Sequence, residues 1–292
     1  MSDSDSTNVG IDPFKDILLA SDGSEFGAGT ERIGLELAQR HGARLHVFRL
    51  LTASPGTDEG LTEEQEANLQ MERMTELCAD RGVECIPLLR PGNGDPGLAI
   101  VAAAKEIGTQ LVIMGRRGRR GLAKLMVGEA TAKVIEKAEC SVLVAPRLVS
   151  YWSNGVLLVL EDPPQGEGDA AAIAAFHLAL HARIPLTILM MAEEQDNDAE
   201  RRETNQTVNR LVAMAHLQGV ACEGMVQFGD IDEIALETAR QRAADLIVCE
   251  PRDRSVIEKL FNANNIIKLI GQVHCPVLVV KPVAAGAAPA VD

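Results

Sequence analysis

The sequence predicts an α/β protein of two tandem domains, each a doubly wound sheet of five parallel strands. Its length of 292 residues suits two domains of about 100–200 residues each. Short apolar segments such as 111–114, which lack polar alternation, recur between helical patterns, and this alternation is typical of parallel strands covered on both faces. The second half also repeats the first, because Leu246 and Cys275 lie 135 residues after Leu111 and Cys140.

Turn and capping signals separate the expected elements of the first half. Gly42 is expected to end the first helix, and Asp95 to cap the third helix. Pro87 removes a ladder donor, so its strand is expected at a sheet edge. The strands are expected at 17–20, 45–51, 82–89, 111–114 and 141–146, and the helices around 33–38 and over 63–81, 98–107 and 129–137.

The second half is expected to follow the same order. Asp230 and Glu233 form a candidate capping arrangement at the start of its third helix. The last strands of the two halves are apolar and would each be unpaired on one side, so packing the halves about a pseudo-two-fold axis would cover both. The strands are expected at 156–160, 186–191, 221–228, 246–249 and 277–280. The predicted domain limits are a disordered N-terminus 1–15, domain 16–147, linker 148–154, domain 155–283 and a disordered tail 284–292.

Composition excludes several classes of function. With a net charge of −14 and 3% aromatic residues, the protein is not expected to bind nucleic acid. The six cysteines form no C-x-x-C pair, which favours buried thiols in a reducing compartment. The start is polar and acidic, and no apolar run reaches the roughly 18–20 residues of a membrane span, so a cytoplasmic protein is expected. The histidines are scattered, and the pair His177 and His181 is interpreted as an ordinary helical pair, with no metal site and no catalytic constellation.

A glycine-rich basic loop follows the fourth expected strand and precedes a helix, which is an arrangement suited to anions. In a doubly wound sheet, ligands bind beyond the carboxyl ends of the strands. If the first strand lies beside the fourth, this loop and the Asp22-Gly23-Ser24 loop line one crevice. Two alternatives stay open: Asp22 and Ser24 could only cap the next helix, and the cations could belong to a solvated loop. The cations are Arg116, Arg117, Arg119, Arg120 and Lys124.

These loops, the tandem offset and the Cys-(Ser/Pro)-Val-Leu-Val strands resemble the universal stress protein family over about residues 16–282. The resemblance implies the strand order 3-2-1-4-5 and a regulatory or stress-response role rather than catalysis. It also implies dimerisation through the last strand. In this chain the two halves would form an intramolecular pseudo-dimer, and a homodimer of the whole chain is left open. Members with the pattern G-x2-G-x9-G-(Ser/Thr) bind ATP, for which Mg²⁺ is a candidate companion. The resemblance implies an adenine nucleotide site formed by Asp22, Gly23, Ser24, Leu50, Met114, Gly115, Arg117, Gly118, Gly128 and Glu129.

Two departures from the family pattern shape the functional hypotheses. Glu129 stands where ATP-binding members carry a hydroxyl, and a carboxylate repels phosphate unless the arginines offset it. At the matching offset, the second half replaces all three glycines, and we therefore expect its site to be degenerate. Its replacements are Glu250, Asp253 and Ala263, with Glu161-Asp162-Pro163 in place of the aspartate loop. The alternative to nucleotide binding is a nucleotide-independent scaffold for unknown protein partners, and slow ATP hydrolysis is not excluded.

Overall fold

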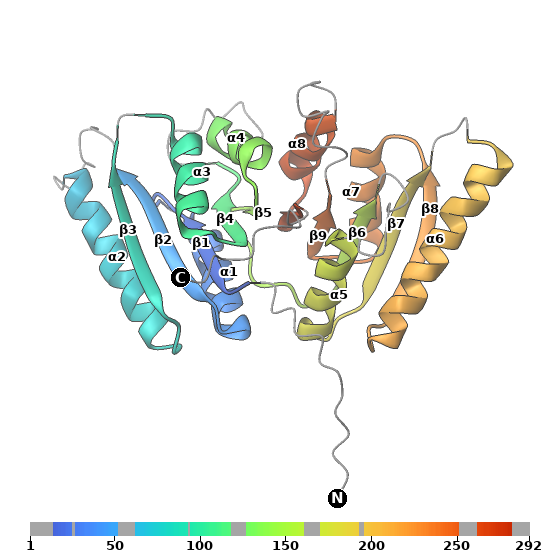
Figure 1. The fold of residues 1–292 in the computed structure, drawn as a ribbon, viewed down its shortest axis with the longest axis horizontal. Coiled ribbons are helices and arrows are strands. Elements are labelled where there is room, and N and C mark those ends of the chain that lie inside the picture. Colours follow the sequence, from blue (N-terminus) through green and yellow to red (C-terminus); the bar gives the residue numbers. More distant parts are fainter. Residues whose placement is uncertain are drawn as a thin grey trace, which may run out of the picture.

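A computed structural model describes residues 14–24, 27–51, 62–92, 94–117, 127–160, 170–192, 196–250 and 262–281. Within these ranges, ten strands form one continuous sheet in the order β3-β2-β1-β4-β5-β10-β9-β6-β7-β8 (Figure 1). Each half thus has the strand order 3-2-1-4-5, and the predicted fold class is confirmed. The predicted disordered ends lie outside the described residues, apart from 14 and 15.

The elements of the first half follow one another as the sequence predicts. They are β1 (Asp16–Ala20), α1 (Ala28–His41), β2 (Arg44–Leu51), α2 (Glu63–Ala79), β3 (Cys85–Pro91), α3 (Pro96–Ile107), β4 (Leu111–Gly115), α4 (Glu129–Lys137) and β5 (Ser141–Ala145). Gly42 ends α1 in the left-handed conformation, with φ of 61°. The Asp95 carboxylate caps α3 by accepting the Leu98 N–H at 3.1 Å, and β3, which contains Pro87, is an edge strand.

The second half repeats this order. Its elements are β6 (Val156–Leu160), α5 (Ala170–Ala182), β7 (Leu186–Ala192), α6 (Asp198–Leu217), β8 (Cys222–Phe228), α7 (Ile231–Gln241), β9 (Leu246–Cys249), α8 (Asn262–Gln272) and β10 (Val277–Val279). The predicted capping role of Asp230 is wrong: it precedes α7, but its side chain makes no capping hydrogen bond. The capping boxes that the structure describes at α2 and α6 each have an uncharged cap, Thr62 or Asn197, whereas Asp230 and Glu233 are both carboxylates that would repel each other in a box.

Two apolar layers cover the sheet. One face carries α1, α2, α5 and α6, whose buried side chains pack against β-strand residues such as Leu19 and Leu158. The other face carries α3, α4, α7 and α8, which pack against residues such as Leu18 and Val112. The inner strands are buried on both faces, which explains their lack of polar alternation, whereas the edge strands β3 and β8 are partly exposed. None of the described helices is long and apolar enough to cross a membrane.

The two halves join through their last strands. β5 and β10 pair antiparallel, with Leu143 opposite Leu278, while all other strand pairs described are parallel. Each apolar strand thereby covers the open edge of the other, as the sequence predicts. The seam lies at the middle of the sheet in Figure 1.

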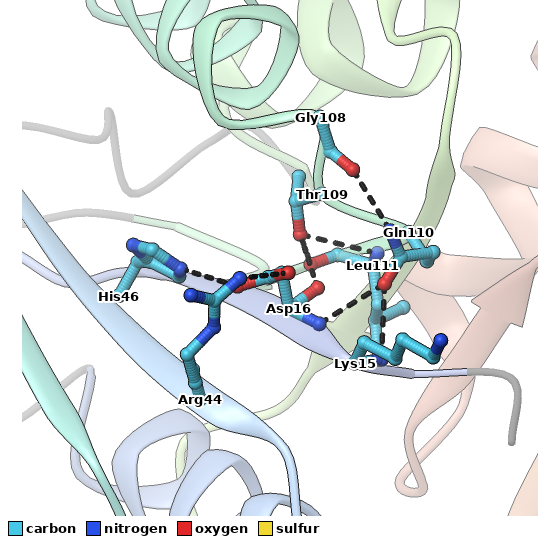
Figure 2. Close-up of polar contacts among 8 residues, drawn as sticks. All are labelled: Lys15, Asp16, Arg44, His46, Gly108, Thr109, Gln110 and Leu111. Carbon is cyan, nitrogen blue, oxygen red and sulfur yellow. Dashed lines mark hydrogen bonds and ion pairs between the residues drawn. The ribbon is translucent and has the colours of Figure 1, made fainter. Parts of the chain in front are cut away.

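A polar cluster fastens the amino ends of β1, β2 and β4 (Figure 2). The Asp16 carboxylate accepts hydrogen bonds from Arg44 at 2.8 Å and lies 2.8 Å from His46 Nε2. Gln110 Oε1 accepts the Lys15 and Asp16 N–H groups, both at 3.0 Å. Because this end lies opposite the carboxyl ends of the strands, we assign the cluster a structural role.

Replacing Asp16 with asparagine is expected to lower the free energy of unfolding at pH 7 by about 2 kcal/mol, because charge-assisted hydrogen bonds are lost. Burial raises the pKa of Asp16, but the hydrogen bonds from Arg44 and His46 outweigh burial and hold the pKa below its usual value. A lowered pKa stabilises the fold above the unfolded value of about 3.9, and this contribution disappears as the pH falls below it. Urea unfolding measured from pH 7 to pH 3 should therefore show the unfolding free energies of wild type and Asp16→Asn approaching each other.

The matched control for this experiment is Glu139→Gln, which removes a carboxylate from an exposed ion pair with Lys105. Its unfolding free energy should change by less than about 0.5 kcal/mol at any pH. A constant gap between wild type and Asp16→Asn down to pH 3 would contradict the assignment.

Candidate functional site

The site predicted from the sequence is placed where the chain leaves β1 and β4. The two strands are neighbours, with Ala20 in register with Met114. After β1 the chain passes to α1 on one face of the sheet, and after β4 it passes to α4 on the other face. This is a topological switch point, the place where open α/β sheets bind ligands.

The aspartate loop folds on itself at the end of β1. Asp22 Oδ1 accepts both the Ser24 N–H at 3.0 Å and the Ser24 hydroxyl at 2.5 Å. Gly23 is left-handed, with φ of +70°, and its N–H donates to Ser21 Oγ at 3.2 Å. The alternative that Asp22 and Ser24 cap the next helix is wrong, because α1 begins only at Ala28 and has no side-chain cap.

The glycine loop closes between the end of β4 and the start of α4. The Gly128 N–H donates to the Arg116 carbonyl oxygen at 2.9 Å, so the two ends of the loop lie together. Gly128 is the N-cap of α4, and a Cβ placed on it would meet no atom of the described residues nearer than 3.6 Å. Packing against this part of the chain therefore does not require glycine here. Gly118, Arg119, Arg120 and Lys124 lie outside the described residues.

Two further residues complete the described part of this loop. Glu129 is the exposed first residue of α4, where its charge interacts favourably with the helix dipole. Thr131, which the sequence analysis missed, is buried and donates its hydroxyl to the Gly115 carbonyl oxygen at 3.0 Å. A hydroxyl in the first turn of a helix after a glycine loop is the signal that could have identified it. Thr131 thus fixes the end of β4 against the start of α4.

Arg116 does not belong to the predicted phosphate-binding cations. Its guanidinium Nη1 lies within hydrogen-bonding distance of the carbonyl oxygens of Ile270, Gly271 and Val273, at 3.1, 2.9 and 3.2 Å. Burial lowers the pKa of Arg116, and neighbouring Arg117 lowers it further. The prediction is corrected because the carbonyl end of α8, which carries partial negative charge, attracts this arginine across the seam. Arg117 remains at the loop.

Leu50 and Met114, two further residues of the predicted adenine nucleotide site, also lie at this end of the sheet. The Ser21 N–H donates to the Phe48 carbonyl oxygen at 3.2 Å, and β2 continues past β1 to Leu50. Leu50 is half-buried on the face covered by α3 and α4. Met114 is only 5% exposed, so its side chain belongs to the core.

Beneath the aspartate loop lies a buried polar network that the sequence analysis missed. Arg49, 4% exposed, donates from Nη1 to Gln70 Oε1 at 3.0 Å and lies 3.7 Å from Glu66. A Cβ on Gly23 would lie 2.8 Å from both Arg49 Nη1 and Gln70 Oε1. The sequence signal for this network is Arg49, a single charged residue inside the apolar strand 45–51.

The network continues to α1 through a buried carboxylate. Glu31 accepts hydrogen bonds from Ser21 Oγ and Gln70 Nε2, both at 2.9 Å, and from Arg73 at 2.5 Å. These contacts tie the loop after β1 to two helices. They hold the Asp22 loop in position from below.

A comparison with known protein families identifies the family of this fold. The model of the universal stress protein family matches residues 13–146 and again 158–281. The chain belongs to this family. The universal stress protein YxiE of Bacillus subtilis is 32% identical over 147 residues, covering 45% of this chain and 98% of YxiE. A universal stress protein of Thermus aquaticus is 34% identical over 136 residues, covering 45% of this chain and 98% of that protein.

A solved structure matches both halves together. The universal stress protein from Archaeoglobus fulgidus gives a TM-score of 0.70 at 17% identity, covering 92% of this chain and 96% of that one. At this identity the likeness concerns the fold. The tandem arrangement of two universal stress protein domains is therefore shared by both proteins.

The second universal stress protein domain differs from the first at the equivalent place. A small hollow beyond the ends of β6 and β9 is lined by Asp232, Cys249 and Glu250, among others. Two carboxylates there disfavour a phosphate. The replacements at Glu161, Asp162, Pro163 and Asp253 lie outside the described residues, as does the side chain of Ala263.

Proposed function

We propose that the first domain of this universal stress protein binds an adenine nucleotide, with ATP as the first candidate. The observation that carries the proposal is Gly128, a glycine at the N-terminus of α4 that packing against the described residues does not require. A glycine there lets phosphate oxygens approach backbone N–H groups closely. Arg117 and the cations of the undescribed loop would contribute charge, and Asp22 and the Leu50 backbone would meet the ribose and the base.

The second domain is proposed to be a degenerate partner, because two carboxylates and an alanine, Glu250, Asp253 and Ala263, replace the glycines that would meet phosphate. The protein would act in the cytoplasm as a regulator in the stress response, without a catalytic role of its own. Nucleotide binding would then change which protein partners it contacts. A phosphate-release assay with the Gly118→Glu variant as control tests the non-catalytic part of this proposal.

Isothermal titration with ATP, ADP and AMP, each with and without Mg²⁺, tests the central part. Wild type is expected to bind, and Gly118→Glu, which adds an anion to the loop, is expected not to bind. Absence of heat and of copurified nucleotide at millimolar concentrations would favour a nucleotide-independent scaffold. The observation that favours such a scaffold is the exposed Glu129 at the start of α4, because its carboxylate would repel a phosphate.

Replacing Glu129 with serine is expected to tighten ATP binding about fivefold. The change removes a charge that, about 4 Å from a phosphate in water, costs about 1 kcal/mol. The gain should be larger for ATP than for AMP, which carries fewer charges. Glu136→Ser, at the other end of the same helix, is the matched control and should leave affinity unchanged. Equal or weaker ATP binding by Glu129→Ser would show that this carboxylate does not face the phosphates.

A further inference from the structure

Three histidines from the two halves meet where the end of α1 approaches α5 across the seam. His41 is the last residue of α1, and His177 and His181 lie one turn apart on α5. One ring nitrogen from each lies within 4.8 Å of the other two. Only the pair on α5 is evident from the sequence, because nothing local indicates that His41, more than 130 residues away, joins it.

The spacing of the rings suits a tetrahedral metal ion. With metal–nitrogen distances of about 2.0–2.1 Å, the centroids of two coordinating imidazoles lie about 5 Å apart. The observed centroid distances are 4.2 Å between His177 and His181, 4.9 Å between His41 and His181, and 5.5 Å between His41 and His177. Small rotations of the side chains would bring the three nitrogens onto one ion.

The surroundings combine a fixed ligand with an open approach. His41 is 6% exposed, and the Phe14 ring packs edge-on against it with centroids 5.6 Å apart. His177 is half-buried and His181 is exposed, so an ion can reach the cluster from solvent. Two histidines four residues apart on a helix form a chelating pair, and a third ligand from another element completes a three-histidine set.

We propose that His41, His177 and His181 bind one divalent transition-metal ion, with Zn²⁺ as the first candidate and water as the fourth ligand. Imidazole ligands suit Zn²⁺, Ni²⁺ and Cu²⁺ rather than Mg²⁺ or Ca²⁺. The ion would link α1 of the first domain to α5 of the second and would stabilise their tandem arrangement. The cluster lies at the carboxyl end of α1, away from the crevice that follows β1, so it is independent of nucleotide binding.

The test uses the full chain without a histidine tag, freed of metal by chelator, in the absence of nucleotide. Equilibrium dialysis against Zn²⁺ followed by elemental analysis is expected to give one ion per chain. His177→Gln and His181→Gln are each expected to lose this ion. His274→Gln, which removes an exposed histidine outside the cluster, is the matched control and should retain it.

A second readout follows from the only tryptophan. Trp152 stacks on Tyr151, which packs on Arg40, the residue before His41. Cu²⁺ is therefore expected to quench the fluorescence of Trp152 and to saturate at one equivalent in wild type but not in His181→Gln. Since His181 is exposed, that variant should fold normally, which circular dichroism checks. Absence of a stoichiometric ion in wild type, or its retention in folded His181→Gln, would overturn the proposal.

Discussion

Replacing Gly128 with alanine is expected to weaken ATP binding at least tenfold while leaving the fold intact. Among the residues that the structure describes, a Cβ at this position would meet nothing nearer than 3.6 Å, and the backbone conformation suits any residue. Stability should therefore change by less than about 1 kcal/mol. A bound phosphate approaches the backbone more closely than a methyl group permits, and a loss of 1.4 kcal/mol already equals a tenfold change.

This substitution also reproduces in the first domain what the second domain carries at Ala263. The matched control is Gly94→Ala, because a Cβ there would meet no atom of the described chain within 4 Å. Titration calorimetry with ATP on both variants makes the comparison. Unchanged affinity in Gly128→Ala would remove the main argument for a phosphate site at this helix.

Replacing Arg49 with alanine is expected to lower the free energy of unfolding by about 3 kcal/mol. The guanidinium is buried between Gln70 and Glu66, and removing one partner of a buried ion pair leaves the other uncompensated. The same network supports Gly23, so nucleotide affinity should fall as well. Urea unfolding measures the first effect and titration the second.

Arg90→Ala provides the control on the neighbouring strand. Arg90 pairs with Glu106, but both side chains are largely exposed, at 45% and 65%. Replacing Arg90 with alanine should lower the free energy of unfolding by less than about 1 kcal/mol. If the two variants were equally stable, the network under the aspartate loop would have no special role in the fold.

The elements of this protein were predictable because their signals are local. The unbroken apolar residues 111–114 indicate a buried strand, and Gly42 and Asp95 mark helix ends by their own chemistry. The repeat at 135 residues then extends the prediction to the second half. Local rules failed at Asp230, where the residue type fits a cap but the neighbouring carboxylates do not favour one.

The site was only partly predictable, because several of its contacts join distant parts of the chain. Glycines indicated the loops at Gly23 and Gly128, since close approach to the backbone needs a missing side chain. Nothing local shows that Arg116 binds carbonyl groups of α8, more than 150 residues later. The partners of Arg49 on α2 were equally invisible, although a charge inside an apolar strand signals that such partners must exist.

The most direct test of the account is the number of adenine nucleotides that one chain binds. Equilibrium dialysis of the nucleotide-free protein against labelled ATP measures this number. We predict one nucleotide per chain, bound by the domain that keeps its glycines. A value of two would show that the second domain is not degenerate, and a value of zero would contradict nucleotide binding altogether.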